Sequence, residues 1–227
     1  MRVSGHILAM GGGILLDRNS RLEDFMLGLA GSDRPRVCFL PTAGGENPEW
    51  IVRFYEEFSA RGCEPSHLTL FGMPENPAEH VAQQDVIYVG GGNTANMLAL
   101  WRVHEIDRAL REAWGRGAVL GGMSAGANCW FEGCVTDSFG PELRELDDGL
   151  GILSGSFCPH YDGEPERRPT YTRLVGAGIL PPGYAADDDA AFHFQGRKLV
   201  EVVSQRDDAC GYRVTPEGEE PIAPRLL

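Results

Sequence analysis

The sequence predicts an α/β domain whose parallel sheet is covered by helices on both faces. Short apolar runs alternate with segments of helical periodicity, and glycine-rich loops join them, which is the pattern of repeated strand–helix–strand units. With 42% hydrophobic and 23% charged residues, the 227-residue chain has enough apolar side chains for one sizeable core. Its 30 glycines and 15 prolines form no repeat. We therefore expect a single domain over residues 1–227.

In the first half of the chain, strands and helices alternate regularly. The helix predicted at 48–58 opens on Pro48 and stops at Gly62, because proline suits the first helical turn and glycine the position after a helix. The other elements predicted here are a buried strand at 5–13 that runs into a glycine turn, a helix at 22–29, and strands at 36–40, 67–71 and 85–89.

The longest helical stretch covers residues 96–114, where apolar residues recur roughly with the helical period. The next strand, at 118–120, ends on a turn at Ser124, and a helix follows at 125–130. After about residue 128 the pattern loosens. Short apolar pieces at 151–158, 190–194 and 199–203 predict added strands, whose antiparallel pairing is left open.

The formal net charge of −13, without any run rich in Lys or Arg, argues against binding to nucleic acid or to an anionic membrane. Both of these partners require clustered cations. The excess of acidic residues is most simply a contribution to solubility. The alternative is an acidic rim that favours cationic groups on a substrate.

The six cysteines form no CxxC pair and no spacing typical of a small disulfide scaffold. Several lie within apolar runs, so buried free thiols explain them better than disulfides or zinc ligands do. We also find no pattern of a signal peptide and no apolar run approaching 18 residues, and we expect a cytoplasmic location. The six are Cys38, Cys63, Cys129, Cys134, Cys158 and Cys210.

The segment G-M-S-A-G at residues 122–126 predicts a nucleophile elbow. Such an elbow holds its nucleophile on a cramped turn between a strand and a helix, and small neighbouring residues let the backbone take that turn. A strand before Ser124 and a helix after it fit this context. The alternative is a turn of small residues in which the serine is incidental.

A second glycine turn, at residues 90–94, follows the strand at 85–89. It fits a loose dinucleotide-binding fingerprint, but no acidic residue stands at the ribose-binding distance. The alternative is that an amide of Gly91 or Gly92 supplies half of an oxyanion hole, with the amide of Ala125 as the other half. This second interpretation uses both turns.

A serine nucleophile needs a base, and we favour His160 over His193. His160 follows a strand-like run and stands among turn formers, whereas His193 alternates within a strand and is expected on a sheet surface. The third group should be a carboxylate that orients the imidazole. The acidic run at 187–189 is a candidate, although such a run is usually a solvated turn. The rival carboxylates are Asp162, Glu132 and Asp137.

The segments at 89–94, 122–128 and 159–161 together resemble the peptidase E family of serine peptidases, which includes cyanophycinase-like enzymes. The resemblance implies a flavodoxin-like three-layer α/β/α sandwich with a mostly parallel sheet, related to class I glutamine amidotransferases. We expect no metal and no cofactor. The residues it implies are Ser124 as nucleophile, His160 as base, Asp188 as the aligned third residue, Gly91 and Ala125 as oxyanion donors, and Gly92, Asn93 and Thr94 at the substrate.

The chain departs from the family pattern in two ways. The N-terminal-aspartate-specific members have a cation soon after the nucleophile segment, whereas residues 128–139 contain neither Lys nor Arg. The glutamate of those members, which varies elsewhere in the family, is also replaced by an aspartate. We therefore expect a hydrolase of short peptides without assuming specificity for Asp-X dipeptides, and a homodimer is compatible with the sequence. The rival hypotheses are a non-catalytic module that binds a small ligand, and a nucleotide-binding enzyme that uses residues 90–94.

Overall fold

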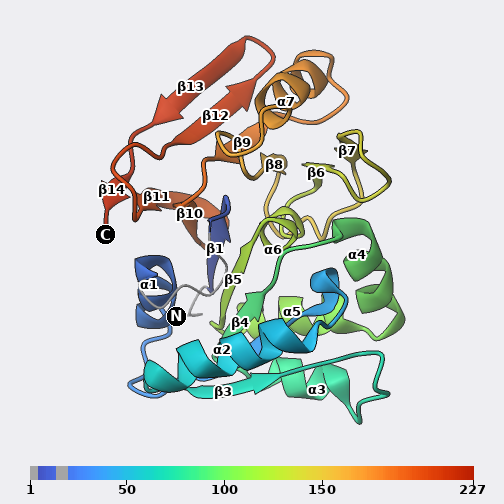
Figure 1. Ribbon diagram of the computed structural model, residues 1–227, viewed down its shortest axis with the longest axis vertical. Helices are drawn as coiled ribbons and strands as arrows, with labels where there is room; N and C mark the ends of the chain where they lie inside the picture. The colour runs from blue at the N-terminus through green and yellow to red at the C-terminus, as the bar shows by residue number, and fades with distance from the viewer. Residues whose placement is uncertain (1–4, 14–19) are drawn as a thin grey trace.

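The computed structural model describes residues 5–13 and 20–227, and within them the central sheet has eight strands in the order β14-β11-β10-β1-β5-β4-β2-β3 (Figure 1). Five neighbouring strands are parallel: β1 (His6–Met10), β5 (Val119–Met123), β4 (Val86–Val89), β2 (Arg36–Leu40) and β3 (Glu64–His67). Antiparallel pairing extends the sheet beyond β1 through β10 (Ala190–Gln195) and β11 (Lys198–Ser204), and β14 (Arg225–Leu226) then pairs in parallel with β11.

Helices cover both faces of this sheet, which confirms the predicted three-layer architecture. On one face, α1 (Arg21–Gly28) and α2 (Pro48–Ala60) bury Met26, Phe54 and Phe58 against the sheet. On the other face lie α3 (Pro77–Ala82), α4 (Thr94–Val103) and α5 (Ile106–Gly115), which bury Trp101 and Leu110. The strand order reverses after β3, so right-handed crossovers place the earlier and later helices on opposite faces.

The less regular second half of the sequence forms a second sheet, drawn above the first in Figure 1. The helix α7 (Arg167–Gly176) packs on it through Tyr171, Leu174 and Val175. Strand β9 leads through residues 187–189 directly into β10, so the acidic run joins the two sheets. In order, the strands are β13 (Gly218–Ile222), β12 (Gly211–Thr215), β9 (Gly183–Ala186), β8 (Ser156–Cys158), β6 (Gly133–Thr136) and β7 (Arg144–Leu146).

The predicted third strand was misplaced: β3 covers Glu64–His67 and not residues 67–71. Pairing with β2 ends at His67, after which the chain turns. The following apolar residues form a loop that buries Leu68 and Leu70, and the carboxylate of Glu46 binds the amides of Leu70 and Phe71. The apolar run therefore reflects a buried loop, which periodicity alone does not separate from a strand.

The predicted helix at 96–114 is two helices, α4 and α5, separated where Glu105 takes a left-handed φ of 57°. No glycine or proline marks this break in the sequence. The helix expected at 125–130 is a single turn, α6 (Ala125–Asn128). A short 3₁₀ turn, η1 (Thr42–Gly44), follows β2. Of the apolar piece at 151–158, β8 alone is strand.

The prediction of free cysteines is confirmed. All six thiols are unpaired with one another; five are buried and Cys210 is partly exposed. Burial raises the pKa of each, to about 12 for Cys38 and Cys134. These thiols therefore stay neutral at ordinary pH.

Candidate active site

Ser124 stands between β5 and α6 in a strained backbone conformation, with φ of 55° and ψ of −113°. The glycines on either side have no room for a side chain: a Cβ on Gly122 would lie 2.5 Å from the carbonyl oxygen of Gly126, and one on Gly126 would lie 2.3 Å from that of Val89. This is the crowding that a nucleophile elbow requires. It explains why small residues surround the serine.

The glycine turn after β4 lies beside Ser124. A Cβ built on Gly91 would be 3.4 Å from Cβ and 3.9 Å from Oγ of Ser124. Gly92 has a φ of 133°, and a Cβ there would lie 2.1 Å from the carbonyl oxygen of Ala43. The two turns named from the sequence therefore meet at the carboxyl ends of neighbouring strands.

The side chain of Asn93 makes two hydrogen bonds within the protein. Oδ1 of Asn93 accepts a hydrogen bond from the amide of Asn96 at 2.9 Å and so caps α4, and its Nδ2 donates to the carbonyl of Ser138 at 2.9 Å. Thr94 is buried. These residues shape the turn that carries Gly91.

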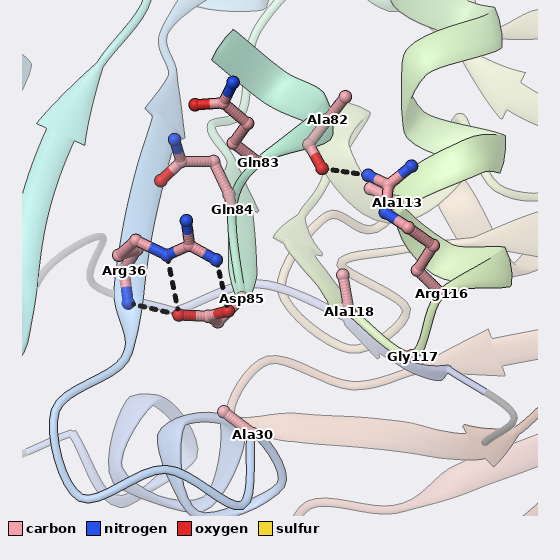
Figure 2. Close-up of a pocket in the computed structure, with 10 residues that line it drawn as sticks. All are labelled: Ala30, Arg36, Ala82, Gln83, Gln84, Asp85, Ala113, Arg116, Gly117 and Ala118. Carbon is pink, nitrogen blue, oxygen red and sulfur yellow. Dashed lines mark hydrogen bonds and ion pairs between the residues drawn. The ribbon is translucent and has the colours of Figure 1, made fainter. Parts of the chain in front are cut away.

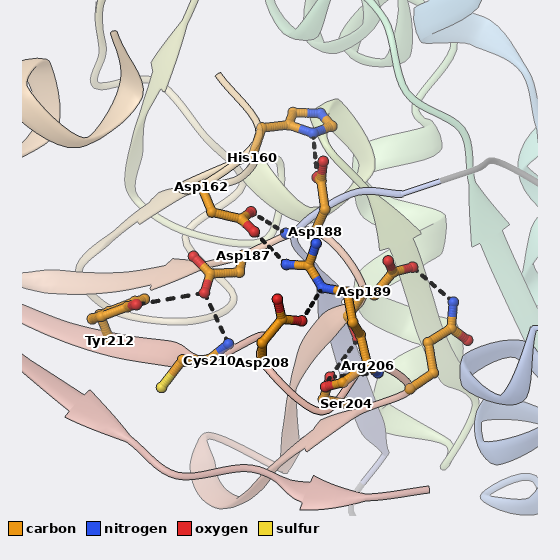
Figure 3. A network of polar contacts seen from close by, with 11 residues as sticks. His160, Asp162, Asp187, Asp188, Asp189, Ser204, Arg206, Asp208, Cys210 and Tyr212 are labelled. Carbon is orange, nitrogen blue, oxygen red and sulfur yellow. Dashed lines mark hydrogen bonds and ion pairs between the residues drawn. The ribbon is translucent and has the colours of Figure 1, made fainter. Parts of the chain in front are cut away.

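His160 and Asp188 form a hydrogen-bonded pair, with 2.7 Å between Nδ1 and Oδ1 (Figure 3). Both side chains keep partial exposure, 19% for the histidine and 26% for the aspartate. His160 also has a left-handed φ, of 53°. Among the carboxylates that the sequence leaves open, Asp188 is thus the one that the structure brings to His160.

Three consecutive residues, the last of β1 and the two that follow it, tie the parts of the site together. The amide of Ser124 donates to the carbonyl of Met10 at 3.3 Å, and that of His160 to the carbonyl of Gly11 at 3.1 Å. Gly12 accepts from the amide of Asp189 at 3.1 Å. Sequence reasoning assigned no role to the glycines at 11–13, although they follow a buried strand just as the other two glycine turns do.

The acidic run at 187–189 is not a solvated turn, contrary to the usual interpretation of adjacent acids. Asp187 is 3% exposed, and its Oδ2 accepts a hydrogen bond from the amide of Cys210 at 2.9 Å. Burial raises the pKa of Asp187 to about 6. Asp189 accepts from Nε2 of Gln205 at 2.8 Å. The three side chains therefore serve three different contacts (Figure 3).

The rival base and the rival carboxylates named from the sequence have other partners. His193 was expected on a sheet surface, which is wrong: it is 5% exposed, and its Nε2 lies 2.9 Å from Nδ1 of His6. Burial lowers the pKa of both histidines. Glu132 accepts from the amide of Gly155 at 2.8 Å. Asp162 binds the backbone of Asp188 and not the imidazole.

A cavity of about 620 Å³ lies at the opposite end of the sheet (Figure 2). It is lined by residues at the amino ends of β2, β4 and β5, and its Arg36 is held by Asp85 through hydrogen bonds of 3.1 and 2.9 Å. Since ligands of parallel sheets bind at the carboxyl ends of the strands, we place the candidate site at Ser124.

Within residues 5–13 and 20–227, no three His, Cys, Asp or Glu side chains are grouped as a metal site. The same residues contain no helix with the length and apolar character needed to span a membrane.

Comparison with known proteins places the chain in a family. The model of peptidase family S51 matches residues 7–202. An uncharacterized peptidase, YgaJ, of Bacillus subtilis (strain 168) is 51% identical over 211 residues, covering 92% of this chain and 91% of the relative. Peptidase E of Pasteurella multocida (strain Pm70) is 27% identical, covering 82% and 81%.

A solved structure has the same fold. The crystal structure of a peptidase from an acI-B1 Actinobacterium matches with a TM-score of 0.78 at 20% identity, covering 98% of this chain and 96% of the other. The family match spans both glycine turns, Ser124 and the pair of His160 and Asp188. The resemblance drawn from the sequence is thereby confirmed, and the chain belongs to peptidase family S51.

Proposed function

We propose that this chain is a serine-type peptidase that cleaves short peptides, with Ser124 as nucleophile, His160 as general base and Asp188 as the carboxylate that orients the imidazole. One observation carries the proposal. The amides of Ser124 and His160 bind the consecutive carbonyls of Met10 and Gly11, while Nδ1 of His160 is 2.7 Å from Asp188. The backbones that carry the proposed nucleophile and base are thus held side by side at the end of β1, with the carboxylate bonded to the base.

In the proposed reaction, Oγ of Ser124 attacks the peptide carbonyl carbon as Nε2 of His160 takes the hydroxyl proton. His160 then gives that proton to the departing amine, which breaks the peptide bond and leaves an acyl ester on Ser124. Water attacks this ester with His160 again accepting a proton. The proton returns to Oγ as the carboxylic acid leaves.

The amides of Gly91 and Ala125 are the proposed donors to the oxyanion. Gly91 lies against Ser124, and Ala125 begins the helix that follows it. Removing one such donor costs about 3 kcal/mol of transition-state stabilisation in comparable sites. In this proposal Gly92, Asn93 and Thr94 contribute to substrate binding by holding the turn in shape.

The proposed substrates are short peptides with a free amino terminus, and they are not restricted to an N-terminal aspartate. The formal net charge of −13 favours a cationic amino group on the substrate. The segment 128–139 carries no cation. Arg167, which follows His160, is buried and pairs with Glu164 at 2.7 Å, so it is committed within the fold.

A dipeptide library read by mass spectrometry tests this function, with Ser124→Ala as the matched control. We expect the wild type to release free amino acids from part of the library, and the variant to release none above background. A fluorophosphonate should label the wild type and not the variant. Equal labelling of both, or turnover that survives Ser124→Ala, would reject a serine mechanism. Ligand-induced thermal shifts without any turnover would favour the binding-module alternative.

A further inference from the structure

We propose that Asp162 and Arg206 are positioning residues, which act through the backbone of Asp188 to hold its carboxylate against His160; this inference rests on the proposed function. The two residues come from separate segments. Asp162 stands two positions after His160, and Arg206 follows β11. Neither is among the residues that the family resemblance implies.

The backbone of Asp188 must be fixed because the side chains of the three consecutive aspartates point to three different partners. The side chain of Asp187 turns inward to the amide of Cys210, and that of Asp189 turns to Gln205. Asp188 alone of the three meets the imidazole. A small rotation of the backbone at 188 would therefore move the carboxylate away from Nδ1.

Asp162 supplies the hold through a direct hydrogen bond. Its Oδ1 accepts from the amide of Asp188 at 2.8 Å. The neighbouring amide of Tyr161 donates to the carbonyl of Ala186 at 3.1 Å. Two hydrogen bonds thus join the segment that carries His160 to the segment that carries Asp188, in addition to the bond between the two side chains.

The turn after Asp162 also encloses the carboxylate. A Cβ on Gly163 would lie 2.3 Å from Oδ2 of Asp188. Since Oδ1 of Asp188 meets His160, the two oxygens are confined from two sides. The position of this turn depends on where Asp162 is held.

Arg206 holds Asp162 by an ion pair from its guanidinium to Oδ2, seen in Figure 3. Its Nε lies 3.0 Å from Oδ1 of Asp208. The guanidinium also places a cation among the carboxylates of Asp162, Asp187 and Asp208, which would otherwise repel one another. The arginine bond and the amide of Asp188 keep the pKa of Asp162 below its ordinary value despite burial. Asp162 can thereby remain an ionised acceptor.

The test compares Asp162→Ala, Asp162→Asn, Arg206→Ala and Arg206→Lys in the full chain, using a peptide that the wild type cleaves. We expect Asp162→Ala and Arg206→Ala to lower kcat on the order of tenfold or more with KM changed less than about threefold, because in this proposal both residues act through the backbone of Asp188 and not on the substrate. Arg206→Lys should restore part of the loss. Fluorophosphonate labelling should slow in parallel.

The matched control is Arg225→Ala. This substitution breaks another surface ion pair, in which Nε of Arg225 lies 2.7 Å from Oε2 of Glu201. A double-mutant cycle separates positioning from general stability: in the Asp188→Ala background, Asp162→Ala should lower kcat less than about twofold further. If Asp162→Ala fails to fold, kcat of Asp162→Asn and of Arg206→Ala is compared with that of the control instead.

Two results would overturn the inference. One is kcat in the Asp162 and Arg206 variants equal to that of Arg225→Ala. The other is a fall in kcat on Asp162→Ala that is as large in the Asp188→Ala background as in the wild type. Either result leaves the proposed function intact, provided that the wild type turns over. Absence of turnover and labelling in the wild type would instead count against the proposed function itself.

Discussion

Gly12 packs directly against the imidazole of His160. A Cβ on Gly12 would lie 2.2 Å from Nδ1 of His160 and 2.0 Å from Oδ1 of Asp188. The absence of a side chain at this position therefore lets the two groups meet. The first glycine turn of the chain belongs to the site as much as the two turns that the sequence singled out.

Gly12→Ala is expected to separate His160 from Asp188 and to lower kcat about 100-fold or more, because a displacement near 1 Å has that effect in oriented sites. Activity and thermal unfolding are measured together. The control is Gly28→Ala, where a Cβ meets no atom within 4 Å and alanine favours the helix. Wild-type activity in Gly12→Ala would contradict the packing described here.

Gly91 and Gly92 should respond differently to alanine. At Gly91 a Cβ makes an ordinary contact of 3.4 Å with Ser124, so Gly91→Ala should fold while a substrate carbonyl is pushed from the amide and kcat falls on the order of tenfold or more. At Gly92 the clash with Ala43 and the φ of 133° should destabilise the protein by several kcal/mol. Circular dichroism and kinetics distinguish the two, and an active Gly91→Ala would argue against its role as a donor.

The strain at Ser124 is also measurable. With φ of 55° at a non-glycine residue, the backbone stores roughly 1–3 kcal/mol. Ser124→Gly should therefore be more stable than Ser124→Ala by about 1 kcal/mol in urea unfolding, while both lack activity. Equal stability of the two variants would mean that the turn carries little strain.

Glu23 gives a prediction on pH that does not depend on the site. It is 4% exposed, its Oε1 accepts from the hydroxyl of Tyr88 at 3.1 Å, and burial raises its pKa to about 7. The ordinary pKa is 4.5. As the pH rises, Glu23 therefore ionises at a lower pH in the unfolded chain than in the folded protein. The stability that the protonated carboxyl contributes is complete below pH 4.5 and is lost as the pH rises to about 7.

Glu23→Gln cannot ionise and keeps an acceptor for Tyr88. We expect it to be more stable than the wild type by roughly 1–3 kcal/mol at pH 8 and nearly equal at pH 4.5. Glu56→Gln, at an exposed position of α2, is the control and should show no such dependence. Urea unfolding at both pH values measures this, and a gain of equal size at both would point to packing and not to ionisation.

Local features of the sequence were sufficient to predict much of the fold and the nucleophile. Strand β2 lies at the predicted residues, and the turn at Ser124 has the predicted form. Both depend on interactions close in the chain, such as the crowding of Gly122 against Gly126. The break at Glu105 was missed because no residue nearby forbids a continuous helix.

What the sequence by itself determined is therefore the alternating α/β pattern, the two named glycine turns and the serine between strand and helix, since steric rules act over a few residues. Only the tertiary structure decided which acid meets His160, because the partner lies 28 residues away and its neighbours are equal in type. It likewise decided the pairing of Arg206 with Asp162 across 44 residues and the closeness of Gly12 to the imidazole. These contacts depend on where the two sheets join, which no local pattern encodes.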